Sequence, residues 1–296
     1  MGKEIETESY ILAPDPDAVR LTRGVTGRDQ NGEITEINVV EERPLTIFLN
    51  AREIVTAMTI GDYPEYLALG FLRNQGMITD ADKVLGVEYD EESEAVVVRT
   101  DQRTRFEDKL EKKTRTSGCA VGTVFGDMME GLEGLTLPSG EVKLSDLYAL
   151  SAKINRTPSI YLSAGAIHGT VLCEGGRPLV YMEDVGRHNA VDKVAGWMFS
   201  EGISPEGKLL YTTGRLTSEM VIKTVQMNIP ILVSRSGFTA WGVELARQAN
   251  LTLIGRARGR RFVALAGQDR IVYDADPDMV EDELDKHRRK AASAEE

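Results

Sequence analysis

The sequence predicts an α/β protein whose larger second half follows a smaller α+β unit. After residue 150, strand-like segments alternate with helical segments of roughly 10–12 residues, which is typical of βαβ units and of a sheet covered on both faces. Before residue 100, short strand-like segments surround one amphipathic helix. The loop Gly134–Gly140 separates the two patterns. We therefore expect an N-terminal domain over residues 1–137, a second domain over 138–277 and a charged tail over 278–296.

The first half contains few elements. Residues before about Val39 are polar and acidic, which predicts a partly mobile segment. A helix is expected between Pro64, which suits a first helical turn, and Gly76, which ends it. The segments that read as strands are Arg43–Asn50, Glu53–Met58, Val84–Tyr89 and Ala95–Arg99.

The second half has stronger periodicity and predicts a mainly parallel sheet. We expect strands at Ile160–Ala166, Gly169–Cys173, Pro178–Met182, Leu209–Thr213, Pro230–Ser234 and Leu251–Ala257, with edge strands at Arg261–Leu265 and Arg270–Tyr273. We expect helices at Val124–Leu132, Leu144–Ile154, Thr217–Met227 and Thr239–Asn250, and one that begins near Asn189.

Composition excludes several classes of protein. The chain has 296 residues and a net charge of −12, which argues against general nucleic-acid or membrane binding. No apolar run approaches the roughly 20 residues that span a bilayer, and the acidic N-terminus does not resemble a signal peptide. Its two cysteines, Cys119 and Cys173, do not suggest a disulfide framework, so we expect a reducing, cytoplasmic location.

Three polar turns of the second half share one design, and each places a glycine and an arginine before a helix. They are Asp184–Asn189, Thr213–Ser218 and Ser234–Thr239. Turns at the carboxyl ends of parallel strands line one crevice, where arginines and helix starts suit a phosphorylated ligand. The alternative is three unrelated capped turns. The next strand ends in the basic run Arg256–Arg261, and no Walker motif is present.

The first of these turns belongs to the stretch Glu183–Lys193, which combines acidic, basic and amide side chains at a helix start. Its histidine, His188, is the better functional candidate, while His168 lies between two predicted strands and His287 lies in the charged tail. The alternative for this stretch is a helix cap with a solvated charge cluster. Without Cys-x-x-Cys or His-x-Glu, we expect no metal site and no zinc.

Cys119 lies in the glycine-flanked loop Ser117–Gly122, just before a predicted helix. Small neighbours leave a thiol accessible, and Arg115 together with a helix start would lower its pKa. Such a thiol suits nucleophilic or sulfur-transfer chemistry. The alternative is a buried small hydrophobe, which is the role we expect for Cys173 within an alternating strand.

From Arg43 to Phe262 the chain resembles the formate dehydrogenase accessory sulfurtransferase family, FdhD. The densest matches are Glu183–Lys193 and Gly214–Lys223, and further ones are Ile231–Ser236, Leu251–Gly255, and Gly70–Leu72 with Gly76–Ile78. The resemblance implies a second domain similar to the three-layer cytidine deaminase fold. It also implies a cytoplasmic homodimer that takes sulfur as a persulfide from a cysteine desulfurase.

By the same resemblance, the sulfur passes through Cys119 to the molybdenum bis-guanine-dinucleotide cofactor before formate dehydrogenase receives it. The cofactor would lie in the crevice inferred above, where Lys193 could also assist. The residues expected to contact it are Arg187, His188, Gly214, Arg215, Ser234, Ser236, Arg256, Ala257, Arg258, Gly259, Arg260 and Arg261.

The chain departs from the family pattern in three places. Gly122 stands where the family has a second cysteine, so a resolving thiol is absent from the loop. Gly255-Arg256 replaces a usual Gly-Phe, and Ser236-Gly-Phe-Thr239 replaces Ser-Ala-Pro-Thr. The missing cysteine motivates an alternative, a cofactor-binding chaperone without sulfur transfer. A third reading, a nucleotide deaminase or hydrolase, follows from fold similarity alone.

Overall fold

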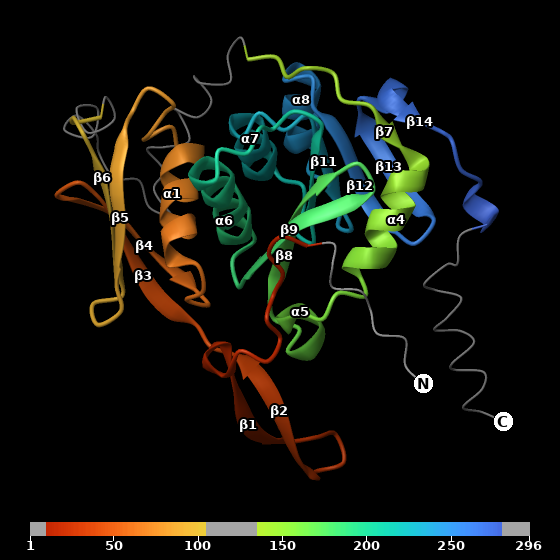
Figure 1. The fold of residues 1–296 in the computed structure, drawn as a ribbon. Coiled ribbons are helices and arrows are strands. Elements are labelled where there is room, and N and C mark those ends of the chain that lie inside the picture. The colour runs from red at the N-terminus through yellow and green to blue at the C-terminus, as the bar shows by residue number, and fades with distance from the viewer. Residues whose placement is uncertain (1–9, 105–134, 280–296) are drawn as a thin grey trace.

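A computed structural model describes residues 10–104 and 135–279. Its centre is a six-stranded sheet in the order β13-β12-β11-β10-β8-β9 (Figure 1). The strands are β8 (His168–Glu174), β9 (Arg177–Asp184), β10 (Lys208–Thr212), β11 (Ile231–Ser234), β12 (Thr252–Arg258) and β13 (Arg261–Ala266).

The only parallel pairs of neighbouring strands in this sheet are β10–β11 and β11–β12, so the sheet is mixed rather than mainly parallel as the periodicity suggested. Both β8–β9 and β12–β13 are hairpins with short connections, and a short connection can join only antiparallel neighbours. Because β8 runs against β10, the carboxyl ends of β9 and β10 still lie at the same edge.

Helices cover both faces of this sheet. On one face, α6 (Arg187–Ser200), α7 (Ser218–Gln226) and α8 (Ala240–Gln248) pack on side chains such as Leu210 and Leu232. On the other face lies α4 (Leu144–Ile154), whose apolar side chains share a core with Tyr211 and Val233. Side chains that alternate along each strand therefore supply two separate cores.

A second sheet of four strands, in the order β4-β3-β6-β5, stands beside the helices. The helix α1 (Pro64–Asn74) lies between this sheet and α6 (Figure 1). The four strands, all predicted from the sequence, are β3 (Arg43–Leu49), β4 (Arg52–Thr59), β5 (Val84–Asp90) and β6 (Ala95–Thr100).

The helices α1 and α6 cross in backbone contact. A Cβ atom added to Gly70 would lie 1.7 Å from the carbonyl oxygen of Asp192, and one added to Gly196 would lie 1.9 Å from that of Tyr66. Only glycine allows such an approach. The crossing fixes the first half of the chain against α6, the helix that follows the polar turn Asp184–Asn189.

One expectation for local structure is wrong, and one pair of strands was not expected. The segment Ile160–Ala166 begins with the short helix α5 (Ile160–Ser163) rather than a strand, because the Glu183 carboxylate accepts hydrogen bonds from the first two backbone N–H groups. The polar segment before Val39 forms the hairpin of β1 (Thr22–Arg28) and β2 (Ile34–Val40), which extends away from both sheets (Figure 1).

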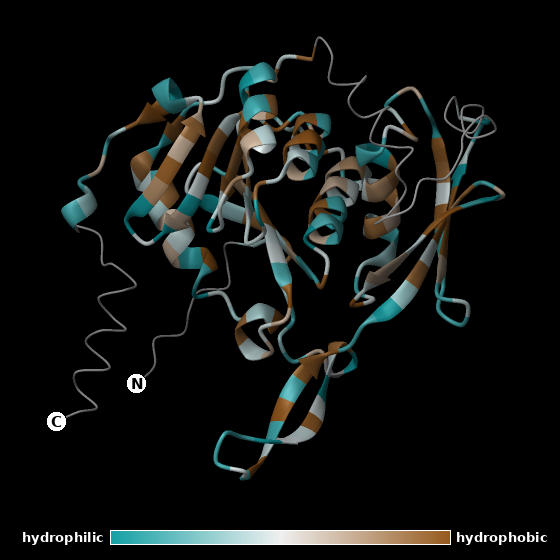
Figure 2. Ribbon diagram, turned by 180° about the vertical axis from the view of Figure 1, so that it is seen from behind, coloured by the Kyte–Doolittle hydropathy of each residue, from teal (hydrophilic) through white to brown (hydrophobic). Residues whose placement is uncertain are grey.

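Smaller elements complete the described chain. Figure 2 shows hydrophobic residues in the projecting hairpin as well as in the two sheets, and Ile34 is 73% exposed there. No helix in the part of the chain described is long and apolar enough to cross a membrane. The remaining elements are η1 (Val19–Leu21), β7 (Val142–Lys143), η2 (Gln268–Arg270), β14 (Ile271–Val272) and η3 (Pro277–Met279).

Candidate functional site

The turns after β9, β10 and β11 meet at one edge of the central sheet. The Ser234 hydroxyl donates a hydrogen bond to the carbonyl oxygen of Gly214 (2.6 Å) and accepts one from the Ser236 backbone (2.9 Å). A Cβ atom on Gly214 would lie 3.0 Å from the Cβ of Arg187, so the first turn packs on the second. Each turn therefore touches the next, as expected for strands whose carboxyl ends share an edge.

A cavity of about 1010 Å³ opens beside the third turn, and we call it the arginine cleft. Leu144, Tyr148 and Phe262 supply apolar walls. None of the described residues that line it is acidic, and five are arginines: Arg235, Arg256, Arg258, Arg260 and Arg261. The cleft combines ring surfaces with guanidinium groups, which suits a ligand carrying both an aromatic base and phosphates.

The shape of β12 directs two of these arginines outward. Arg256 has a positive φ of 54°, and the pairing of β12 with β13 shifts between Gly255 and Arg258, which marks a β-bulge. Arg256 and Arg258 are exposed in consequence, while Ala257 points into the core. The Arg256 backbone N–H also donates to the Ser236 carbonyl oxygen (2.7 Å), which ties the bulge to the third turn.

The cleft arginines differ in their local partners. The Arg258 Nε donates to the Arg235 carbonyl oxygen (3.3 Å), so these two residues lie together. The Arg260 guanidinium lies 3.5 Å from the exposed Asp278 carboxylate. The backbone carbonyl oxygen of Arg260 accepts a hydrogen bond from the hydroxyl of Tyr148 on α4 (3.2 Å). Gly259 has a φ of 54° and forms the turn between β12 and β13.

Seven of the twelve sequence-predicted contact residues do not line the cleft, namely Arg187, His188, Gly214, Arg215, Ser234, Ala257 and Gly259. Ser234 is fully buried, and its hydroxyl is used between the turns. Ala257 packs with Ile254 in the core beneath α4. Gly214 is buried under Arg187. Ser234, Ala257 and Gly214 shape the edge of the sheet, because the carboxyl end of a strand is still part of the core.

Most of the stretch Glu183–Lys193 holds the fold together. Lys193 is fully buried and forms ion pairs with Asp62 and with Asp184, 2.6 Å away, and donates to the Glu183 carbonyl oxygen (2.9 Å). Burial alone lowers the pKa of Lys193, but the two carboxylates outweigh it and raise that pKa. A role for Lys193 at the ligand is therefore not supported.

Asp184 connects the central turn to the first half of the chain. One of its oxygens accepts from the Thr59 hydroxyl (2.5 Å) on β4, and the other from the Gly186 backbone (3.0 Å) and the Asn189 amide (2.9 Å). The start of α6 is therefore fixed from both sides. The alternative of a solvated charge cluster is wrong for these residues, which are largely buried.

Arg187 and His188, the first two residues of α6, are the members of this stretch left for a ligand. The His188 Nε2 pairs with Glu219 (3.0 Å), and this contact is the main reason that the pKa of Glu219 is lowered. Among the described residues, the buried Arg187 Nε and His188 Nδ1 atoms have no hydrogen-bond partner. Arg215, in the next turn, is exposed.

The second matched motif, Gly214–Lys223, also contains a buried ion pair. Lys223 lies 2.5 Å from Asp192 of α6, whose other oxygen accepts from both Lys223 (2.6 Å) and Asn74 (2.8 Å) of α1. An isolated buried charge is costly, so this contact favours one arrangement of α1, α6 and α7 relative to each other.

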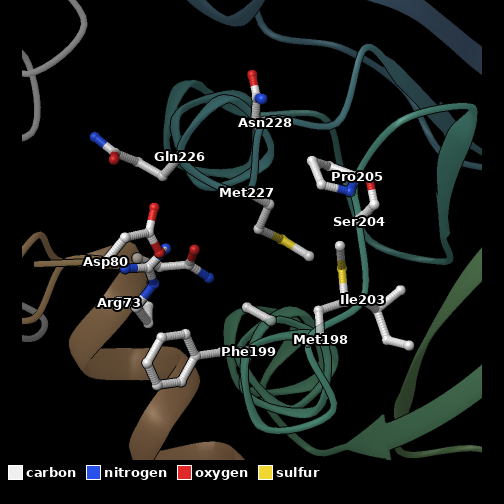
Figure 3. A pocket seen from close by; sticks show the side chains of 13 residues that line it. Arg73, Asp80, Met198, Phe199, Ile203, Ser204, Pro205, Gln226, Met227 and Asn228 are labelled. Carbon is white, nitrogen blue, oxygen red and sulfur yellow. Dashed lines mark hydrogen bonds and ion pairs between the residues drawn. The ribbon is translucent and has the colours of Figure 1, made fainter. Parts of the chain in front are cut away.

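A separate cavity of about 510 Å³ lies at the opposite ends of α1, α6 and α7 (Figure 3). Met198, Met227 and Phe199 line it, and Arg73, the one arginine among its described lining residues, is paired with Asp80 at 2.7 Å. The Arg73 guanidinium also lies 4.7 Å from the centre of the Phe199 ring. None of the sequence-predicted site residues that the structure describes lines this cavity, so we place the candidate functional site at the edge of the central sheet that carries the arginine cleft.

Sequence reasoning missed several residues at this edge. Arg235 was noted only as part of a turn, yet it lines the arginine cleft and a smaller chamber beside it. Its position directly after a buried strand was the available signal. Tyr148 and Tyr161 reach the edge from α4 and α5, and nothing in their local sequence marks them.

Other predictions lie outside the described residues, namely Cys119 with its loop, the helix Val124–Leu132 and His287. Cys173 is fully buried, as predicted, and burial raises the pKa of its thiol. Among residues 10–104 and 135–279, no group of three His, Cys, Asp or Glu side chains is placed to hold a metal ion.

Comparison with known proteins agrees with the resemblance seen in the sequence. The sulfur carrier protein FdhD of Bacillus subtilis is 30% identical over 260 residues, which cover 86% of this chain and 98% of that protein. The protein of the same name from Wolinella succinogenes is 31% identical over 228 residues, covering 76% and 79%.

A crystal structure named for a putative formate dehydrogenase accessory protein from Desulfotalea psychrophila has a similar fold. Its TM-score is 0.69 at 28% identity, over 85% of this chain and 98% of that one. The model of the FdhD/NarQ family matches residues 40–272, which include the six-stranded and four-stranded sheets and the arginines of the arginine cleft. The chain therefore belongs to the FdhD/NarQ family.

Proposed function

We propose that this protein is a sulfur carrier that supports formate dehydrogenase maturation, with Cys119 as the sulfur-bearing residue. The relatives named sulfur carrier protein FdhD support this, as does the likeness to a formate dehydrogenase accessory protein. The observation that carries the proposal is the arginine cleft, because a sulfur carrier for a phosphorylated cofactor needs a site for its phosphates.

The expected substrate is the molybdenum bis-guanine-dinucleotide cofactor. Its pyrophosphates would pair with Arg235, Arg256 and Arg258, while its guanines would pack on the apolar walls of the cleft. Arg187 and His188 would contact the same ligand from the start of α6, where an anion is favoured.

Sulfur transfer would begin with the Cys119 thiolate, which attacks the outer sulfur of a persulfide on a cysteine desulfurase. The new S–S bond forms on Cys119 as the old one breaks, and the desulfurase cysteine leaves as a thiolate, so no oxidant is needed. Because Gly122 replaces a second cysteine, the loop has no thiol to displace this persulfide. We propose that the protein acts in the cytoplasm as a homodimer.

Mass spectrometry tests the sulfur-carrying step. After incubation with a cysteine desulfurase and free cysteine, we expect one added sulfur atom on the Cys119 peptide, and no addition on the Cys173 peptide because that thiol is buried. Absence of added sulfur on Cys119 would remove the sulfur-carrier proposal.

The alternative is a cofactor-binding chaperone that transfers no sulfur, and the glycine at position 122 favours it. Formate dehydrogenase activity in cells carrying Cys119→Ala separates the two. A sulfur carrier predicts loss of activity, whereas full activity supports the chaperone. Stoichiometric zinc together with nucleoside turnover would instead favour a deaminase.

A further inference from the structure

A smaller chamber of about 270 Å³ adjoins the arginine cleft at the same edge of the sheet. Arg235, Ser236 and Arg258 line both cavities, so the chamber is continuous with the cleft. Its own walls come from Tyr161 of α5 and from the segment that leads into β8.

The chamber is built for negative charge. None of the described residues that line it is acidic, and Arg235 and Arg258 both face it. The Arg235 guanidinium lies 5.6 Å from the centre of the Tyr161 ring, which lines the same chamber. At the other end, His168 Nδ1 lies 3.3 Å from the Thr213 hydroxyl, which also accepts from the Gly169 backbone (3.0 Å).

The environment of His168 reports the same positive field. Burial lowers the pKa of His168, and the nearby positive charges of Arg187, His188 and Arg215 lower it further, against an opposing effect of Asp184. The contribution from the neighbouring positive charges favours an anion beside the ring, whereas burial disfavours a charge of either sign. Either protonation state of the imidazole has a ring N–H that can donate a hydrogen bond to an oxyanion.

Size indicates which part of a ligand fits. Pockets that hold a whole small molecule are roughly 300–1,000 Å³. The chamber, at about 270 Å³, falls below this range, while the arginine cleft, at about 1010 Å³, reaches its top. The chamber therefore suits one charged group and the cleft a nucleoside.

We propose that this chamber is an oxyanion subsite, which takes a phosphate group of the ligand whose nucleoside lies in the arginine cleft. His168 and Thr213 bind the oxyanion at the inner end, and Arg235 and Arg258 neutralise it at the entrance. The inference rests on the proposed function for its nucleotide, but free phosphate-type anions share the chemistry and test it independently.

The experiment uses the full chain, with GDP and inorganic pyrophosphate as probes. The variant Ala166→Phe places a ring in the chamber, because Ala166 lines it. Leu162→Phe is the matched control, since Leu162 lies on α5, is 55% exposed and lines neither cavity. Calorimetry measures affinity, and NMR follows the His168 ring, assigned through His168→Gln.

We expect both probes to shift the His168 resonance in the wild type and in Leu162→Phe. In Ala166→Phe the shift is lost, and both Ala166→Phe and His168→Gln bind GDP at least about tenfold more weakly, as expected for a lost hydrogen bond to a charged group.

If GDP binds the wild type and Ala166→Phe equally and leaves His168 unmoved, the subsite is overturned while the cleft stands. If pyrophosphate shifts His168 but GDP does not bind, the subsite stands and the nucleotide part of the proposed function fails. If neither probe moves His168, the subsite is overturned.

Discussion

Glu183 is a buried carboxylate whose two oxygens both face the start of α5. They accept hydrogen bonds from the backbone N–H groups of Ile160 (2.9 Å) and Tyr161 (3.0 Å). Burial raises the pKa of Glu183 from 4.5 to about 7, although these two hydrogen bonds oppose the shift. One side chain therefore couples the pH of the solution to the helix that carries Tyr161.

Glu183→Gln should change how the free energy of unfolding depends on pH. Between its ordinary pKa of 4.5 and about 7, the folded chain binds this proton and the unfolded chain does not. The contribution of Glu183 to the free energy of unfolding therefore falls as pH rises through that range, by up to about 3 kcal/mol. A glutamine side chain cannot ionise, so the wild-type advantage over the variant should shrink from pH 5 to pH 8 in urea unfolding.

Glu174 is a control carboxylate, whose contribution to the free energy of unfolding should change with pH in the opposite direction. A hydrogen bond from Lys208 lowers the pKa of Glu174, so the wild-type advantage over Glu174→Gln should grow as pH rises through the acid range. Parallel pH curves for wild type and Glu183→Gln would contradict the account of Glu183.

The buried pair of Asp192 and Lys223 gives a second prediction for single residues. Lys223→Met leaves a buried carboxylate without its partner and should lower the free energy of unfolding by about 3–5 kcal/mol. Adding Asp192→Asn removes that charge but keeps an acceptor for Asn74, so the double variant should be more stable than Lys223→Met. Chemical denaturation measures both.

The exposed pair of Arg99 and Glu88, 3.0 Å apart, is the control for this cycle. Arg99→Met should cost no more than about 1 kcal/mol. A double variant at Asp192 and Lys223 that is less stable than the single one would show that charge burial is not the cause.

At the scale of elements, the crossing of α1 and α6 depends on two glycines that face each other. Gly70→Ala or Gly196→Ala would drive a methyl group into a backbone carbonyl and force the helices apart. We expect each to lower the free energy of unfolding by more than about 2 kcal/mol. Thermal unfolding measures the change.

Gly86→Ala is the matched control for these two variants. Gly86 lies in β5, and a Cβ atom there meets nothing within 4 Å. Its effect should stay within about 0.5 kcal/mol. Comparable losses at all three glycines would argue against a close crossing.

The sequence was sufficient for most elements because periodicity and turn residues mark them locally. The bounds of α4 and the presence of the four strands of the second sheet were predicted this way. The helix α5 could not be, since its first N–H groups are satisfied by Glu183, more than twenty residues along the chain. The hairpin β1–β2 was missed because its strands are exposed and lack an apolar face pattern.

The candidate site was predicted in part for a similar reason. Adjacent turns follow from strand order, so the meeting of Gly214, Ser234 and Arg187 could be expected. The sequence could not show which charged side chains are buried, because the partners of Lys193 and Lys223 lie on other elements. The likeness to cytidine deaminase and the domain boundary near residue 137 stay predictions.

At the scale of the whole molecule, the arginine cleft is a positive site on a chain with a net charge of −12. Negative charge elsewhere disfavours non-specific binding of polyanions, while the cleft and its chamber concentrate five arginines at one edge of the sheet. From this distribution we expect selective binding of a small phosphorylated ligand, as proposed above.

The central claim is that the arginine cleft is the ligand site. A titration of the full chain with GDP, followed through the arginine side-chain NMR resonances, tests that claim most directly. We predict that the resonances of Arg235, Arg256 and Arg258 shift together, with an affinity that falls as salt rises, while those of Arg28 and Arg99 on distant strands stay unchanged. The assignment of this edge as the ligand site would be contradicted if the resonances of the cleft arginines did not move at saturating GDP. It would also be contradicted if the two control arginines shifted as much as the three cleft arginines.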